Sequence, residues 1–301
     1  LLTALPDLTV PARRDSQYGV SLRQWRVAES LELGLARSPG DGVLASRLAV
    51  LYGQGAEAGD PARWRSTADA ERNVRAARLT RADLGWKSLL FAVPRLPDAR
   101  PTAPESTLLP DQGFGVMRRD QGRVYVALDY GRSGGGHGHP DRLNLWLVNG
   151  TSRVLEDVGT GSYVDPSLHW YRSTLAHNAP LIDGRSQPMT EGHRRGWEQQ
   201  DDTGWIDAEV WLSDDVLVRR SVVATAGYLV DRVSWKAGRP VTFDLPIHVV
   251  ASIAEATAWR HDSLTGGPGA EDGFAFLANP ECAGPLPVAT LAGDAAMGRV
   301  H

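Results

Sequence analysis

Four prolines between Pro94 and Pro104 divide this sequence into two parts in which the hydrophobic residues follow different periods. Proline has no backbone N–H and a fixed φ, so such a cluster interrupts helices and strands and is typical of a linker. Before the cluster, apolar residues recur with the spacing of a helix, and after it they alternate as in a strand. The sequence therefore predicts a helical part over 1–93, a linker over 94–106 and an antiparallel β part over 107–301.

The helical part contains three stretches with a clear signal. Apolar residues over 22–35 form a stripe that ends at a Ser-Pro-Gly turn. Asp41 can cap a second helix, and Thr80 with Asp83 resembles a capping box for a third. A polar stretch over 63–78 is a weaker candidate. Such helices suit a bundle or a toroid, but they are too few to close one.

The β part consists of short alternating stretches separated by turns, which is typical of an antiparallel sandwich. The clearest hairpin signal is the turn over 120–122, which has alternating apolar residues on both sides. The expected strands lie at 114–116, 124–128, 143–147, 154–155, 179–182, 205–212, 216–223, 228–235 and 241–250.

Charge and composition exclude several classes of protein. The net charge is only −4 and no basic block is present, so nucleic acid is not an expected partner. No apolar run is long enough to cross a bilayer, so we expect no membrane span. The single cysteine, Cys282, excludes an internal disulfide and a cysteine-based metal site. Because the chain begins without an initiator Met, we interpret it as part of a longer protein, and its localisation stays open between periplasmic, secreted and cytoplasmic.

The stretch over 134–187 contains four of the eight histidines. Imidazole is suited both to proton transfer near neutral pH and to metal ligation. His139, Asp157 and His177 could hold a zinc ion at ligand distances of about 2.0–2.2 Å. A Gly-rich surface loop whose histidines have no function is the alternative interpretation.

Two other metal-dependent classes fit this stretch less well. A cupin places an acid a few residues after His-x-His, where this chain has Arg142 and Leu143. A non-haem iron oxygenase uses His-x-Asp and a distant histidine, which His139-Pro140-Asp141 and His193 could imitate. A tripeptide of that kind is common in proteins.

Proton transfer is the second chemistry that these residues allow. His137 ends the Gly-rich run and Tyr171 stands beside Arg172, so the histidine and the tyrosine could act as an acid/base pair that removes a proton from carbon. Tyr171 also stands beside a tryptophan, and its alternative role is that of an aromatic residue in the sandwich core.

Four motifs together resemble the β-domain of the heparinase II/III-type polysaccharide lyases. They are Gly-His-Gly-His-Pro-Asp at 136–141, Asp-Val-Gly-Thr-Gly-Ser-Tyr at 157–163, Trp-Tyr-Arg-Ser-Thr-Leu-Ala-His-Asn at 170–178 and Asp-Gly-Arg-Ser-Gln at 183–187. The segment Val10–Ser16 resembles the one that joins the last helical pairs of that family's toroid. The order and spacing of the set carry the resemblance, because each motif alone is unspecific.

The resemblance implies an α+β multidomain fold, with part of an (α/α) toroid followed by an antiparallel β-sandwich and with sugar bound between the two. It implies that His137 lies in the catalytic cleft and that His139, Asp157 and His177 ligate a structural zinc. Tyr171 is the expected cleft tyrosine, with Tyr163 as its rival.

The implied function is cleavage of a uronate-containing glycan by β-elimination, which makes an acidic polysaccharide or oligosaccharide the expected partner. Arg172 and Asn178 are the expected donors to the charge that develops in the transition state, and a structural salt bridge is the alternative role of Arg172. The family's principal catalytic tyrosine lies upstream of the segment at 10–16, where this chain has only a few residues. A non-catalytic glycan-binding or structural sandwich is therefore the second hypothesis and a metal-dependent oxygenase the third, while the oligomeric state stays open.

Overall fold

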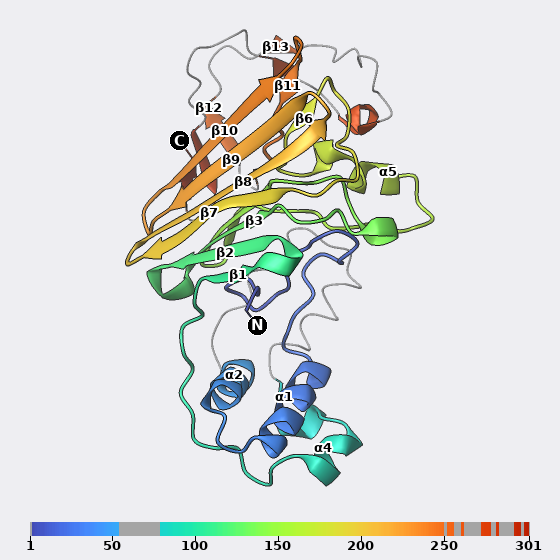
Figure 1. Cartoon of the computed structure of the whole chain (residues 1–301). Coiled ribbons are helices and arrows are strands. Elements are labelled where there is room, and N and C mark those ends of the chain that lie inside the picture. Colours follow the sequence, from blue (N-terminus) through green and yellow to red (C-terminus); the bar gives the residue numbers. More distant parts are fainter. Residues whose placement is uncertain are drawn as a thin grey trace. The chain divides into compact units, whose positions relative to one another are not determined.

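The computed structural model divides the chain into two compact units (Figure 1). One comprises Leu1–Val10 and Gly19–Pro104, and the other comprises Pro11–Tyr18 and Glu105–His301. The structure describes residues 2–53, 79–249, 252–255, 260–261, 272–277, 281–282, 292–295 and 298–300, with side chains over 2–53, 79–249 and 272–277. The helix candidate over 63–78 and the side chain of Cys282 lie outside the described residues.

The first unit is helical, as the apolar period predicts. Its helices are α1 (Trp25–Arg37), α2 (Gly42–Tyr52), the short η3 (Arg81–Asp83) and α4 (Trp86–Phe91). Asp41 caps α2, because its Oδ1 accepts the N–H groups of Val43 at 2.9 Å and Leu44 at 3.0 Å. The capping box of Thr80 and Asp83 is also present; it begins a single 3₁₀ turn, and the short third helix expected after it is α4, which begins at Trp86. No helix in the described part of the chain is long and apolar enough to cross a membrane.

The second unit is an antiparallel β-sandwich. The first sheet has the order β1-β2-β3-β4-β5 and the second the order β10-β9-β8-β7. The first sheet consists of β1 (Thr107–Leu109), β2 (Phe114–Arg119), β3 (Val124–Asp129), β4 (Asn144–Asn149) and β5 (Ser152–Leu155). The second consists of β7 (His193–Gln200), β8 (Thr203–Ser213), β9 (Val216–Ala224) and β10 (Leu229–Ala237). Alternate residues of both sheets, such as Val126, Leu145, Ile206 and Val218, form one buried core.

Shorter elements complete this unit. They are the strand pairs β6 (Leu181–Ile182) with β11 (Phe243–Asp244) and β13 (Arg260–His261) with β14 (Glu281–Cys282), the strands β12 (Ser252–Glu255), β15 (Ala292–Ala295) and β16 (Gly298–Val300), the helix α5 (Leu168–Tyr171), and the single turns η4 (Pro110–Gln112), η5 (Asp120–Gly122), η6 (Gly135–His137), η7 (Thr174–Ala176) and η9 (Phe274–Phe276).

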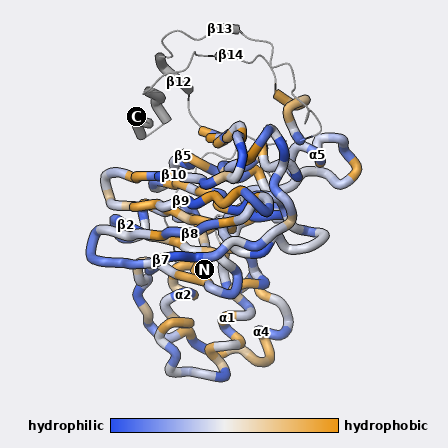
Figure 2. The backbone as a smooth tube through the Cα atoms, turned by 45° about the horizontal axis from the view of Figure 1, so that its top comes forward, coloured by the Kyte–Doolittle hydropathy of each residue, from blue (hydrophilic) through white to orange (hydrophobic). Residues whose placement is uncertain are grey.

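The structure differs from the expected strands at several places, and the sequence analysis identified neither β1 nor β12–β16. The sequence analysis did not identify β7, which is a mostly hydrophilic edge strand in Figure 2 and so lacks the alternation that marks a half-buried strand. The strand expected over 241–250 is only the two-residue β11, followed by an isolated bridge between Leu155 and Val249.

The segment Pro11–Tyr18 belongs to the sandwich unit, although its neighbours on both sides in the sequence belong to the helical one. Arg13 Nε donates to the buried Oδ2 of Asp129, at the end of β3, at 2.8 Å, and a terminal nitrogen of Arg13 forms an ion pair with the same oxygen at 2.7 Å. The N–H of Asp15 donates to the carbonyl of His137 at 3.3 Å. The sequence analysis had included this segment in the helical part over 1–93, whereas the structure assigns it to the sandwich unit.

Candidate active site

The Gly-rich loop after β3 determines where the two histidines point. Gly134 and Gly135 have φ of +96° and +65°, a region that residues with a side chain rarely adopt. A Cβ on Gly138 would lie 1.7 Å from the carbonyl oxygen of Ser133, so no other residue fits there without a shift of the backbone. The loop therefore bends between His137, whose side chain is 82% exposed, and His139, whose side chain is completely buried.

Four polar side chains from different segments converge on the exposed side of this loop. They are Asp15, His137, Tyr163 and Arg172, and we name them the Asp15 cluster. Asp15 Oδ2 accepts from Tyr163 Oη at 2.6 Å, from His137 Nδ1 at 2.8 Å and from a terminal nitrogen of Arg172 at 3.3 Å. His137 Nδ1 and Tyr163 Oη are themselves 3.3 Å apart. The Arg172 guanidinium lies 5.4 Å from the centre of the Tyr163 ring.

The charges in this cluster favour an ionised Asp15 and a protonated Tyr163. Burial would raise the pKa of Asp15, but hydrogen bonds from Tyr163, His137 and His139, together with the charge of Arg172, hold this pKa well below its usual range. The hydrogen bond to Asp15 raises the pKa of Tyr163, because it stabilises the phenol over the phenolate. At neutral pH, Tyr163 is thus a proton donor beside a histidine.

Tyr163, and not Tyr171, is the tyrosine that the structure brings to His137. The ring of Tyr171 packs over Gly161, where an added Cβ would lie 2.4 Å from it, and its carbonyl accepts a hydrogen bond from His177 Nε2 at 3.1 Å. Of the two tyrosines expected for the cleft, the structure thus brings the rival, Tyr163, to His137. The loop over 157–167 brings Tyr163 back towards His137, and sequence spacing does not show that path.

Asn178 is also placed differently from the expectation. Its side chain is completely buried, its Nδ2 donates to the carbonyls of Leu145 at 3.2 Å and Glu156 at 3.1 Å, and its Oδ1 accepts from the N–H of His248 at 2.6 Å. Every polar atom of the amide is thus used inside the fold. The structure assigns Asn178 to support of the loops, whereas Arg172 remains at the surface of the cluster.

Behind the cluster lies a buried group of side chains that could ligate a metal ion, which we name the ligating group. One ligand atom each of Asp141, Asp157 and His177 lies within 4.8 Å of the others, and all three residues are buried. The ring of His139 lies beside them, 5.2 Å from that of His177. The structure thus brings together the expected Asp157 and His177 and adds Asp141, which the sequence analysis considered only within a His-x-Asp tripeptide. His193 is exposed on β7 and is not in this group.

Two observations test whether this group fits a metal ion. His139 Nδ1 and Asp141 Oδ2 are buried without a hydrogen-bond partner in the described part of the chain, which is costly for polar atoms unless something else satisfies them. His177 Nε2 donates to the Tyr171 carbonyl at 3.1 Å, and its Nδ1 lies 2.8 Å from Asp157 Oδ2. The nitrogen and oxygen atoms of this group suit a zinc ion.

His177 Nδ1, the ring nitrogen beside Asp157, is the atom that would bind a cation. Burial alone would lower the pKa of His177, but the carboxylates of Asp157 and Asp141 and the Tyr171 carbonyl raise it to about 9. Without a metal, a proton on Nδ1 faces Asp157. A divalent cation would replace that proton and would use the same lone pair.

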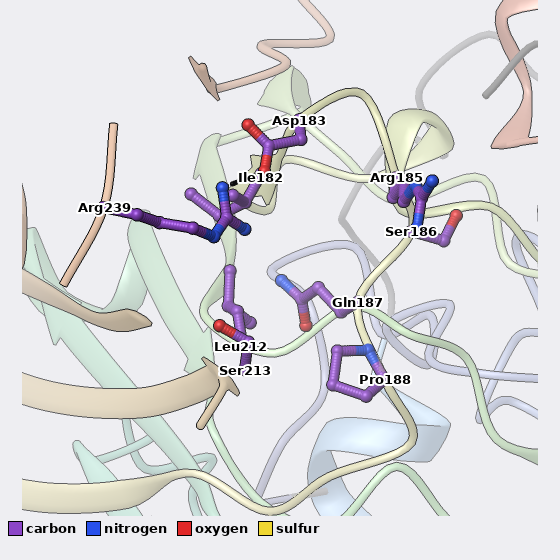
Figure 3. Close-up of a pocket in the computed structure, with 9 residues that line it drawn as sticks. All are labelled: Ile182, Asp183, Arg185, Ser186, Gln187, Pro188, Leu212, Ser213 and Arg239. Atoms are coloured by element: carbon purple, nitrogen blue, oxygen red, sulfur yellow. Dashed lines mark ion pairs between the residues drawn. The ribbon is translucent and has the colours of Figure 1, made fainter. Parts of the chain in front are cut away.

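The Asp-Gly-Arg-Ser-Gln motif lies apart from the Asp15 cluster, in the wall of a cavity of about 450 Å³ (Figure 3). Asp183 forms an ion pair with Arg239 at 2.7 Å across the cavity. Gln187 is buried, with its Oε1 2.7 Å from the N–H of Arg142 and its Nε2 3.0 Å from the Arg142 carbonyl. Gln187 of this motif therefore supports the segment that leads from His139 to β4, and none of the expected site residues lines the cavity.

Comparisons with known proteins agree on one family. The family described as "Heparinase II/III-like, C-terminal" matches residues 101–276. Among solved structures, a heparinase III matches with a TM-score of 0.59 and 14% identity, over 87% of this chain and 36% of that one. The heparan sulfate lyase HepC from Pedobacter heparinus matches with a TM-score of 0.52 and 16% identity, over 77% of this chain and 30% of that one. A comparison with curated proteins found no match.

These structural matches establish the fold and nothing more, because the sequence identities are too low to carry over a function. This chain spans between 30% and 36% of the length of the two solved structures. The antiparallel sandwich is thus shared, and the toroid is inferred from these neighbours.

Proposed function

The chain belongs to the heparinase II/III-like family, and from this premise we propose that it is part of a polysaccharide lyase that cleaves a uronate-containing glycan by β-elimination. The observation that supports this most strongly is the convergence of His137, Tyr163 and Arg172 on the carboxylate of Asp15. An acidic polysaccharide or oligosaccharide is the proposed substrate.

β-Elimination makes three demands on a site. A base removes the proton at C5 of the uronate, an acid protonates the oxygen that leaves C4, and a cationic group neutralises the neighbouring carboxylate so that the C5 proton becomes acidic enough. A positioned acid or base contributes about 10²–10⁴-fold. Stabilisation of the developing charge is commonly the largest single contribution.

His137 is the proposed base. A carboxylate only accepts hydrogen bonds, so the contact with Asp15 keeps the proton of a neutral His137 on Nδ1. Its Nε2 then carries the lone pair, on a side chain that is 82% exposed. The exposed Nε2 is the atom available to a proton on the substrate.

Tyr163 is the proposed acid, because its raised pKa keeps the phenol protonated at neutral pH. Arg172 is the proposed donor to the uronate carboxylate: its side chain is 37% exposed and lies on the same side of the loop. Asp157 and His177, with Asp141 and His139 beside them, would hold a zinc ion behind the cluster. The ion would there stabilise the loops that carry the reacting groups.

The test uses the complete enzyme that contains this chain, incubated with heparan sulfate, alginate or other uronate glycans. β-Elimination leaves a C4–C5 double bond conjugated to the carboxylate, which absorbs in the ultraviolet, whereas hydrolysis creates no such chromophore. We expect His137→Ala and Tyr163→Phe each to reduce the rate by about 10²–10⁴-fold. Tyr171→Phe is the matched control and should retain the rate.

The second candidate is a non-catalytic sandwich that binds glycans. It rests on the antiparallel sandwich that the chain shares with the solved structures. Binding of uronate glycans without release of an unsaturated product would support this candidate and refute the lyase proposal.

A further inference from the structure

One carboxylate lies between the exposed cluster and the buried ligating group. Asp15 Oδ2 accepts from His137 and Tyr163, whereas Asp15 Oδ1 lies 3.1 Å from His139 Nε2. The Asp15 side chain is only 8% exposed, so water competes little for these contacts. Its two oxygens thus contact two different groups of residues.

The contact with Asp15 determines which nitrogen of His139 can bind a metal. Because a carboxylate only accepts, His139 Nε2 carries the proton and Nδ1 carries the lone pair. His139 Nδ1 is the buried atom that lacks a hydrogen-bond partner in the described part of the chain. A histidine that donates one ring N–H to a carboxylate and offers the other nitrogen is the usual arrangement of a metal ligand with its supporting acid.

The backbone around Asp15 is held by the same loop. The Asp15 N–H donates to the His137 carbonyl at 3.3 Å, and Arg13 is bound to the buried Asp129. Asp129 also accepts from Arg142 at 3.1 Å, and Arg142 donates to the His139 carbonyl at 3.4 Å. The carboxylate therefore cannot move away from one histidine without affecting its contact with the other.

We propose that Asp15 is a positioning residue that couples the metal centre to the Asp15 cluster: it orients His139 to bind a metal through Nδ1 and holds His137 and Tyr163 with its other oxygen. Binding of a metal at this centre then changes the contact between His137 and Asp15, although His137 is not a ligand. The effect is reciprocal, since any coupling between two sites acts in both directions. This inference rests on the proposed metal centre and not on the identity of the glycan.

The experiment follows ring ¹⁵N and ¹H signals of the chain labelled at histidine, after removal of metal with a chelator, during a titration with Zn²⁺ alone. His137→Gln and His177→Gln assign the two signals. In the wild-type chain, zinc should shift the signals of both His177 and His137. In Asp15→Asn, zinc should still shift the His177 signal, but the His137 signal should no longer respond.

Zinc affinity is the second measurement. We expect Asp15→Asn to weaken zinc binding by about 10–100-fold, the usual effect of removing an acid that supports a ligand. Asp111→Asn is the matched control, because Asp111 is exposed in η4 of the same unit, and it should change neither the affinity nor the His137 response. If Asp15→Asn does not fold, Asp15→Glu replaces it, since the longer side chain keeps the charge but should not maintain both contacts.

Three results would overturn the inference: no zinc binding by the wild-type chain, unchanged affinity in Asp15→Asn, or a His137 response that persists in that variant. The lyase assay is independent of all three. Release of an unsaturated product without the His137 response would support the proposed function and refute this inference. The His137 response without an unsaturated product would support this inference and refute the proposed function.

Discussion

At the scale of single residues, His177 determines how the stability of the metal-free protein depends on pH. Its pKa in the folded chain is raised from the ordinary 6.5 to about 9, so the folded state binds a proton more tightly than the unfolded state. The resulting stabilisation is complete below about pH 6.5 and is lost as the pH rises towards 9. His139 and His248, whose pKa values burial lowers, act in the opposite direction below about pH 6.5.

We therefore expect the urea concentration at the unfolding midpoint of the chelator-treated protein to decrease as the pH is raised from about 6.5 to 9. His177→Gln should flatten this dependence, and His193→Gln, which changes an exposed histidine, should retain it. A wild-type midpoint that is constant or rises across this interval would contradict the assignment of a proton to His177.

Asn178 should act on stability and not on the substrate. Asn178→Ala would leave the buried carbonyls of Leu145 and Glu156 without this donor and the partly buried His248 N–H without its acceptor. A loss of about 1–3 kcal/mol in the free energy of unfolding is expected, measured by chemical denaturation. Gln200→Ala, at the exposed end of β7, is the control. Unchanged stability with weaker glycan binding would restore the expected role of Asn178 as a substrate contact.

At the scale of elements, the Gly-rich loop offers a matched pair of substitutions two residues apart. A methyl group on Gly138 would lie 1.7 Å from the Ser133 carbonyl oxygen, whereas one on Gly136 would meet no atom within 4 Å. Gly138→Ala should therefore shift the backbone between His137 and His139, at a cost that exceeds about 1 kcal/mol. Gly136→Ala should remain within about 0.5 kcal/mol of the wild type.

Thermal denaturation and zinc affinity measure the two effects together. Gly138→Ala should lower both the melting temperature and the affinity, because the same bend places His139 beside the ligating group. Equal behaviour of the two variants would show that the loop is not held in the conformation described here.

At the scale of the whole molecule, the sandwich unit depends on a segment that precedes it by almost ninety residues. Pro11–Tyr18 belongs to this unit, and Arg13 provides one hydrogen bond and an ion pair to the completely buried Asp129. A buried carboxylate that loses a charged partner retains its cost of desolvation. Arg142 remains bound to Asp129, so the loss is partial.

Arg13→Gln should consequently lower the free energy of unfolding of the sandwich unit by about 1–3 kcal/mol. Arg232→Gln, which removes an exposed arginine of β10, should have no comparable effect. Urea denaturation followed by tryptophan fluorescence, to which the buried Trp146 of this unit contributes, measures the effect. Equal midpoints for the two variants would mean that the segment is not needed to stabilise the sandwich.

Local patterns in the sequence were sufficient to predict most elements. Alternation identified the strands that became β2, β3, β4, β8 and β9, because a residue buried on one face of a sheet recurs at every second position. Asp41 was recognised as a helix cap, because capping involves only the next few residues. The hydrophilic edge strand β7 has no such local signature and was missed.

The sequence by itself also determined which residue types could carry the chemistry, since its motifs placed His137, His139, Asp157 and His177 within one short stretch. Only the tertiary structure decided which of them meet. It brought Asp15 to His137 across 122 positions, chose Tyr163 over Tyr171, added Asp141 to the ligating group and buried Asn178. The physical reason is that hydrophobic period and capping are local, whereas the convergence of polar side chains depends on the paths of loops that long-range hydrogen bonds hold in place.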